Sequence, residues 1–144
     1  MSGRIVVLLC GPPGAGKTTA ARQSGLTVYD RDDEQWHSER QFRAKIAELA
    51  TNPNARAVVI RAGASSSARR KAADLIGATH VYLLTEDPRE LAHRVATRNR
   101  ADKRNGLASI KTWFTQHDRA DNVREFPGWS DALKGAQGST SRAW

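Results

Sequence analysis

The chain has 144 residues, of which 39% are hydrophobic, and a formal net charge of +8. This length suits one domain with a substantial core and leaves no room for a second. No apolar run approaches the roughly 18 residues of a membrane span, and residues 1–4 lead directly into an apolar stretch, so we expect no membrane partner and no signal peptide. The single cysteine, Cys10, excludes an internal disulfide and fits a cytoplasmic protein.

The positive charge is unevenly distributed. Residues 1–50 carry a net charge of +1, whereas residues 51–144 carry +7. An excess of this size favours a polyanionic partner such as a nucleic acid, although a basic surface that serves only solubility accounts for it equally well. Both explanations stay open at this point.

The first half of the chain alternates between predicted strands and helices. Residues 4–10 are predicted as a strand, whose continuous apolar run from Ile5 to Cys10 is typical of burial on both faces. A short helix is predicted over about 16–24 and ends at Gly25. A strand at 26–29 and a helix over about 33–50 follow.

The second half continues the alternation. In order, the predicted elements are strand 57–60, helix 66–76, strand 80–84, helix 85–99, a polar loop at 99–106 and helix 107–121. We expect a kinase domain over residues 1–126 and a tail over 127–144 that is disordered from about residue 135.

A phosphate-binding motif stands between the first strand and the first helix. Residues 11–19 read Gly-Pro-Pro-Gly-Ala-Gly-Lys-Thr-Thr and match the pattern G-x-x-x-x-G-K-[ST] in its proper strand-to-helix context. Glycines let successive backbone N–H groups point at phosphate oxygens, a lysine reaches the β- and γ-phosphates, and a hydroxyl holds Mg²⁺. We therefore predict an ATP site with Thr18 on the metal, formed by Gly11, Gly14, Ala15, Gly16, Lys17, Thr18 and Thr19.

The alternation of strands and helices predicts the fold class. We expect an α/β protein, a three-layer α/β/α P-loop NTPase of the nucleotide-kinase type, with a mostly parallel sheet of four to five strands. The chain lacks the Asn-Lys-x-Asp motif that reads guanine, which favours ATP over GTP.

Carboxylates follow the second predicted strand. Phosphoryl transfer to an alcohol needs a group that accepts the hydroxyl proton, and ligands of parallel sheets bind beyond the carboxyl ends of the strands. Asp32 is our candidate general base, Asp33 is expected to cap the next helix, and Asp30 is a weaker candidate for the base. A helix start that merely carries several carboxylates is the alternative.

Arg94 and Arg98 lie four positions apart on a predicted helix and share one face. A cationic helix that continues into a polar loop suits a lid over about residues 94–106. Such a lid excludes water and stabilises the charge of the transferring phosphoryl group. We predict both arginines as catalytic and ATP-binding residues, with a solvated basic helix as the alternative.

Several segments together resemble the kinase domain of phage-type polynucleotide 5′-hydroxyl kinases. They are the phosphate-binding motif, Tyr29-Asp30-Arg31-Asp32-Asp33, Val58-Val59-Ile60 with Ser67-Ala68-Arg69-Arg70, and Glu90-Leu91-Ala92-His93-Arg94-Val95-Ala96-Thr97-Arg98, in the same order over residues 4–120. The resemblance implies that Lys17 and Thr18 bind phosphate and magnesium, that Asp32 is the base, and that Arg94 and Arg98 clamp ATP. The chain departs from the family at Gln35, where the family has an arginine, and at residues 61–63, where it has Asp-Thr-Asn.

The leading hypothesis is an ATP- and Mg²⁺-dependent kinase of a nucleic-acid hydroxyl, with a nucleic acid or nucleotide as acceptor. Arg31, Asp33 and Arg61 are weaker candidates for contacts with that substrate. One alternative is a kinase of a small molecule such as a nucleoside or nucleotide. Another is a nucleotide-bound interaction module with weak ATPase activity.

Overall fold

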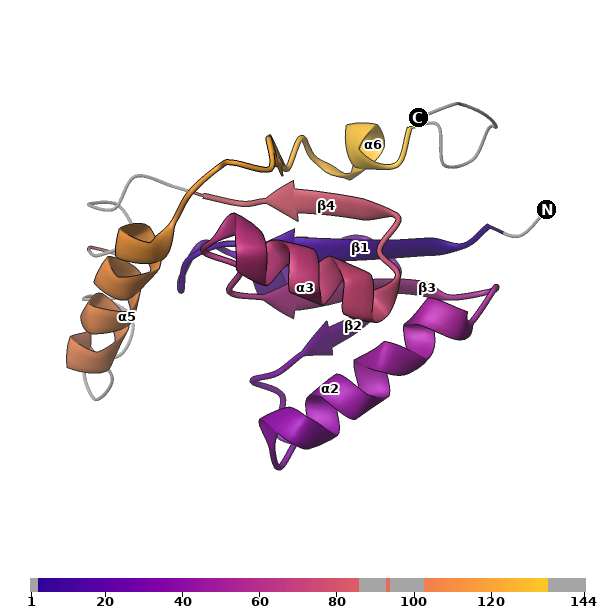
Figure 1. Cartoon of the computed structure of the whole chain (residues 1–144), viewed down its shortest axis with the longest axis horizontal. Coiled ribbons are helices and arrows are strands. Elements are labelled where there is room, and N and C mark those ends of the chain that lie inside the picture. The colour runs from indigo at the N-terminus through magenta and orange to yellow at the C-terminus, as the bar shows by residue number, and fades with distance from the viewer. Residues whose placement is uncertain (1–2, 86–92, 94–102, 135–144) are drawn as a thin grey trace.

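The computed structural model describes residues 3–85, 93 and 103–134, which build one five-stranded, all-parallel sheet (Figure 1). The strand order is β2-β3-β1-β4-β5. The strands are β1 (Ile5–Cys10), β2 (Thr27–Asp30), β3 (Arg56–Arg61), β4 (His80–Leu83) and β5 (Arg124–Glu125). The α/β class and the parallel sheet that the sequence predicts are therefore confirmed.

Helices cover both faces of the sheet. Those described are α1 (Lys17–Arg22), α2 (Glu39–Ala47), α3 (Ser66–Ile76), α5 (Lys103–Gln116) and α6 (Trp129–Ala132), with a 3-10 turn η1 (Glu48–Thr51) after α2. In Figure 1, α2 and α3 lie in front of the sheet, and α5 lies beyond the arrowheads of the strands. None of these helices is long and apolar enough to cross a bilayer.

β1 supplies the centre of the core on both faces. Alternate side chains of a strand point to opposite sides, so Val6, Leu8 and Cys10 join the cluster under α2 and α3. Ile5, Val7 and Leu9 join a second cluster, which packs with Ala21 of α1 and Ala132 of α6. The uninterrupted apolar run at the start of the sequence thus reflects burial on both faces.

β1 lies between β3 and β4, so the chain leaves β1 toward one edge of the sheet and later returns to its other side. The carboxyl ends of parallel strands then border a crevice at this switch point, where open α/β sheets bind ligands. The segments that follow β1, β2 and β3 all lie at this edge.

Two predicted helices have different boundaries in the structure. α2 begins at Glu39 because the Ser38 hydroxyl accepts a hydrogen bond from the backbone N–H of Gln41 (3.0 Å) and caps the helix. Asp33 instead lies in a turn that follows β2, so its predicted capping role is wrong. α5 begins at Lys103, so residues 103–106 are helical and not part of a loop. The remainder of the predicted lid, including Arg94 and Arg98, lies outside the described residues.

The segment after residue 123 contributes elements that the sequence analysis does not anticipate. β5 pairs with β4, and the N–H of Phe126 donates to the carbonyl of Leu83 (2.7 Å). The indole N–H of Trp129 donates to the carbonyl of Ala20 (2.6 Å). The hydroxyl of Tyr82 donates to the backbone carbonyl of Ala132 (2.6 Å). Residues 124–134 therefore pack against the sheet and α1, whereas 135–144 lie outside the described residues.

Gly63, just after β3, adopts a positive φ of 50°. A Cβ at this position would lie 2.3 Å from Sγ of Cys10, which is buried at the end of β1. Gly63 therefore permits both the backbone conformation and the close approach of two strand ends.

We expect Gly63→Ala to lower the free energy of unfolding by about 3 kcal/mol, because left-handed strain costs about 1–2 kcal/mol and overpacking about 1–3 kcal/mol. Gly25→Ala is the matched control, since Gly25 also has a positive φ (78°) but open space around its Cα. Gly25→Ala should lose only the part of the unfolding free energy that comes from left-handed backbone strain. Urea denaturation of both variants measures the difference, and equal losses would contradict the packing argument.

Candidate active site

The phosphate-binding loop connects β1 to α1 and forms one wall of the candidate site. Gly14 and Gly16 have φ values of 80° and 91°, and Gly16 caps α1 in a left-handed conformation. A Cβ on Gly11 would lie 2.2 Å from the carbonyl oxygen of Leu84, so the loop begins in close contact with the end of β4. The glycines predicted from the motif therefore fit backbone positions that a side chain would strain or block.

Lys17 lies folded back over this loop. Its Nζ donates to the carbonyl oxygens of Gly11 (2.5 Å) and Pro12 (3.2 Å). Burial lowers the pKa of Lys17, while the charges of nearby groups, including Asp30 and Asp32, oppose the shift. A phosphate would offer this ammonium group stronger, charge-assisted partners than two neutral carbonyls.

Asp30 links the end of β2 to the first turn of α1. It is buried, and its Oδ2 accepts a hydrogen bond from the hydroxyl of Thr18 (2.7 Å). Its Oδ1 accepts from the backbone N–H of Asp32 (3.0 Å). Both carboxylate oxygens are thus engaged, which makes Asp30 an anchor for Thr18 and for the turn after β2.

Asp32 is exposed and lines a pocket of about 320 Å³ together with Lys17, Arg31 and Arg61. The structure therefore brings the predicted base and the lysine that is predicted to bind phosphate into one pocket. Arg31 and Arg61, predicted as weaker substrate contacts, lie in the same pocket, whereas Asp33 is not among its lining residues.

Glu39, at the start of α2, holds three guanidinium groups. Arg61 contacts it through both terminal nitrogens, and Nε of Arg31 and of Arg43 lie 3.6 Å and 3.9 Å from its carboxylate oxygens. The hydrogen bond from Arg61 lowers the pKa of Glu39 most, and the other two charges add to the effect. Arg61 also lies over the ring of Phe42, 5.3 Å from its centroid. The sequence analysis did not identify Glu39 and Arg43, although their i,i+4 spacing is a detectable signal.

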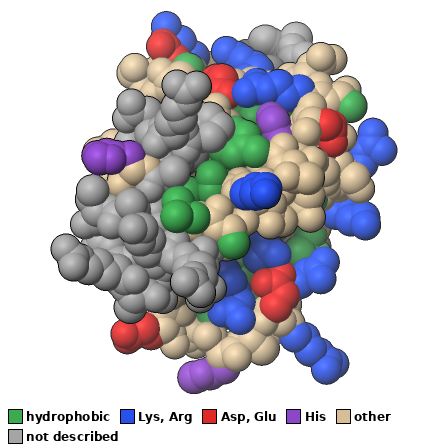
Figure 2. Space-filling model, turned by 90° about the vertical axis from the view of Figure 1, so that its left-hand side faces the viewer, with side chains coloured by type: hydrophobic (Ala, Val, Ile, Leu, Met, Phe, Trp, Pro, Cys, Tyr) green, Lys and Arg blue, Asp and Glu red, His purple; other side chains and the backbone are tan. Residues whose placement is uncertain are grey.

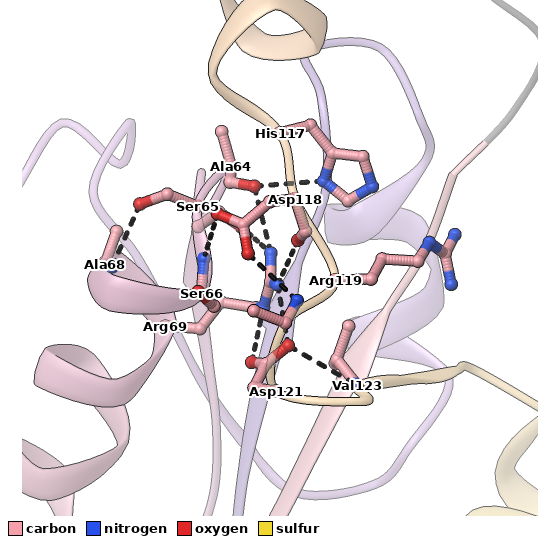
Figure 3. A network of polar contacts seen from close by, with 12 residues as sticks. Ala64, Ser65, Ser66, Ala68, Arg69, His117, Asp118, Arg119, Asp121 and Val123 are labelled. Carbon is pink, nitrogen blue, oxygen red and sulfur yellow. Dashed lines mark hydrogen bonds and ion pairs between the residues drawn. The ribbon is translucent and has the colours of Figure 1, made fainter.

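The loop after β3 is fixed by Arg69, whose side chain is only 1% exposed (Figure 3). Its guanidinium donates to the carbonyls of Gly63 (2.8 Å) and Ala64 (3.0 Å), and to that of Asp118 (2.5 Å). It also forms a double contact with the carboxylate of Asp121, at 2.8 and 3.0 Å. A buried charge without partners costs several kcal/mol, so this set of acceptors is what makes the burial of Arg69 tolerable.

The end of α5 is fastened to the same loop. The indole N–H of Trp113 donates to the carbonyl of Ala62 (2.7 Å), and Nδ1 of His117 lies 2.9 Å from that of Ala64 (Figure 3). The carboxylate of Asp118 accepts from the backbone N–H of Ser66 (3.1 Å). α5, whose first residues belong to the predicted lid segment, is therefore fastened to the loop beside the pocket.

A second pocket of about 510 Å³ lies between this loop and α5. Its polar lining consists of the hydroxyls of Ser65, Ser109 and Thr112 and the amide of Gln116, and none of its lining residues is charged. Figure 2 looks onto this edge of the sheet and shows lysine and arginine side chains around an exposed hydrophobic area.

Solved structures show what this fold resembles. A gluconokinase from Sinorhizobium meliloti 1021 superposes with a TM-score of 0.56 at 17% identity, covering 94% of this chain and 91% of its own. A sugar kinase from Janibacter sp. HTCC2649 gives 0.52 at 14% identity, and a shikimate kinase from Acinetobacter baumannii in complex with shikimate gives 0.51 at 20%; for both, coverage is 92% and 89%. No protein-family model and no curated protein sequence matches the chain. The chain thus has the fold of P-loop kinases.

The aspartates after α5 predict a loss of stability in acid. The pKa of Asp118 is lowered from its ordinary 3.8 to about 2, chiefly by the backbone N–H of Ala120 and then by Ser66, and Arg69 lowers the pKa of Asp121. Both groups bind fewer protons in the folded state, so their stabilisation is complete above about pH 5 and is lost as the pH falls toward 2.

Urea denaturation between pH 6 and pH 2 tests this. Asp118→Asn should be less stable than the wild type at pH 6 and should lose less stability between pH 4 and pH 2. A decline in the variant as steep as in the wild type would contradict the assignment.

Proposed function

We propose that the protein transfers the γ-phosphate of ATP to a hydroxyl group of a small molecule. The observation that carries this proposal is the pocket in which Lys17 of the phosphate-binding loop, the exposed carboxylate of Asp32 and the guanidinium of Arg61 lie together. Phosphoryl transfer needs these three parts: a cation on the phosphates, a proton acceptor, and positive charge near the transferring group.

The residues around Thr18 fit a magnesium ion. Mg²⁺ prefers oxygen ligands and keeps several waters, so it needs few protein groups. The Thr18 hydroxyl donates a hydrogen bond to the Asp30 carboxylate (2.7 Å) beside the phosphate-binding loop, and these are the oxygen groups that would hold the ion, directly or through water. When bound, the ion would neutralise charge on the phosphate oxygens.

Asp32 is the proposed general base. Its backbone N–H donates to Asp30, which fixes the turn, while its side chain is exposed to the pocket and available to an acceptor hydroxyl. In this proposal Lys17 binds the β- and γ-phosphates, and Arg94 and Arg98 close over ATP as lid arginines.

Two features favour a small acceptor. The pockets of about 320 and 510 Å³ fall within the range of roughly 300–1,000 Å³ that small-molecule sites occupy. The structures similar to this fold include kinases named for gluconate, sugars and shikimate. These names describe those proteins. Because they are only 14–20% identical to this chain, we take from them a proposal for the reaction class and none for the particular acceptor.

A polynucleotide 5′-hydroxyl kinase is the second candidate. The net charge of +8, concentrated after residue 50, is the observation that favours it, because a nucleic acid would neutralise that charge. This candidate predicts binding of single-stranded oligonucleotides that weakens steeply with added salt.

Transfer of labelled γ-phosphate from ATP, in the presence of Mg²⁺, tests the proposal. The acceptors are polyols, hydroxy acids, nucleosides, nucleotides and 5′-hydroxyl DNA and RNA oligonucleotides. Asp32→Asn should lower transfer by about 100-fold or more, as expected for the loss of a general base, and leave ATP affinity nearly unchanged.

Glu34→Gln is the matched control, because Glu34 is exposed and lines none of the pockets around the site. It should transfer phosphate like the wild type. Loss of ATP binding in Asp32→Asn, or an equal loss of transfer in the control, would contradict the role of Asp32. Label on oligonucleotides alone would favour the second candidate.

A further inference from the structure

Beside the start of α2, the arginine side chains outnumber the carboxylate that pairs with them, which belongs to Glu39. Three arginines, Arg31, Arg43 and Arg61, share the single carboxylate of Glu39. The three guanidinium groups and the carboxylate of Glu39 together carry a charge of +2. Asp30 and Asp32 balance charge on the side of Arg31 and Arg61 that faces their own pocket, whereas Arg43 has only Glu39 as an acidic partner among the described residues. Charges of one sign held this close repel each other unless an anion joins them.

Two of these arginines line a further pocket, of about 290 Å³, between α2 and α3. Arg43 comes from α2, Arg61 from the end of β3, and Lys71 from α3. None of the other residues that line the pocket is charged. Lys71 forms no ion pair with any residue that the structure describes. We call this space the anion pocket.

The anion pocket adjoins the pocket of the proposed base. Arg61 and Ala62 line both, so the two spaces lie on either side of the same short segment at the end of β3. Glu39 holds Arg61 through two contacts, and the ring of Phe42 lies under its guanidinium. Arg61 is therefore positioned before any ligand arrives, which lowers the entropic cost of binding.

We propose that the acceptor of the phosphoryl group is itself an anion, with a phosphate ester or carboxylate group that binds in the anion pocket to Arg43, Arg61 and Lys71. This inference rests on the proposed function and narrows its substrate class. The acceptor places its hydroxyl beside Asp32 and its anionic group across Arg61. Guanidinium groups bind both phosphate and carboxylate through paired hydrogen bonds, and the apolar side chains of Ile46 and Leu75 line the rest of the pocket.

Binding of small anions tests the pocket without any chemistry. The full-length protein is first saturated with Mg²⁺ and a non-hydrolysable ATP analogue, so that the phosphate-binding loop is filled. Inorganic phosphate and acetate are then titrated at constant ionic strength, and NMR signals of the arginine and lysine side chains are followed. The relative affinities of the two probes distinguish a phosphate site from a carboxylate site.

The double variant Arg43→Gln/Lys71→Gln should bind the preferred anion about tenfold more weakly or worse, because charge-assisted hydrogen bonds are lost. Arg40→Gln/Arg70→Gln is the matched control: it removes the same charge from exposed positions of the same two helices, outside the pocket. It should bind like the wild type. Equal losses in the two variants, or no saturable binding in the wild type, would overturn the proposal.

Phosphoryl transfer supplies a second readout. Acceptors are compared in sets that share one polyol skeleton and differ in carrying no charge, a carboxylate or a phosphate. We expect a charged member to be preferred, with a preference that falls about tenfold in Arg43→Gln/Lys71→Gln and persists in the control. Transfer to the neutral member alone would overturn the inference while supporting the proposed kinase. Dependence of oligonucleotide binding, but not of small-anion binding, on Arg43 and Lys71 would overturn it in favour of a polynucleotide.

Discussion

The candidate site at the carboxyl ends of the strands depends on the hydrogen bonds and the ion pair of one buried guanidinium group, that of Arg69. It is 1% exposed and binds carbonyl groups of two segments that lie far apart in the sequence: Gly63 and Ala64 after β3, and Asp118 after α5. Asp121 supplies the countercharge. A single cation therefore links the loop after β3, the start of α3 and the segment after α5, next to the pockets that the loop lines.

At the carboxyl ends of the parallel strands, the segments after β1, β2 and β3 each supply different chemical groups to the candidate site. The loop after β1 holds Lys17 and Thr18, and the end of β2 supplies Asp30 and Asp32. The end of β3 supplies Arg61, which stands between the proposed base and the anion pocket. In our account the groups after β1 bind ATP, Asp32 after β2 accepts the hydroxyl proton, and Arg61 with the anion pocket selects the acceptor. The arrangement accounts for part of the positive charge of the chain without a nucleic acid.

Features with a local cause could be predicted from the sequence. β1 follows from an uninterrupted apolar run, and α3 spans Ser66–Ile76 as predicted, because Ser65 caps its start and Gly77 ends it. The phosphate-binding loop follows from its motif.

Features with distant causes could not be predicted. Nothing in the run Arg69-Arg70-Lys71 tells which side chain is buried, because Asp121, which supplies the countercharge of Arg69, lies 52 residues further along. β5 is only two exposed residues long and exists because β4 offers an unpaired edge. The start of α2 depends on whether Asp33 or Ser38 caps it, and the turn formed around Asp30 favours Ser38.

The acceptor dependence of ADP formation tests the central claim most directly. ATP and Mg²⁺ are supplied in excess, and the rate of ADP release is measured with each hydroxyl compound in turn, together with the amount of phosphorylated product. Our account predicts that an anionic small molecule accelerates ADP release and is phosphorylated in equal amount. ADP release at one slow rate with every acceptor, oligonucleotides included, would contradict it and identify a nucleotide-bound protein without kinase activity.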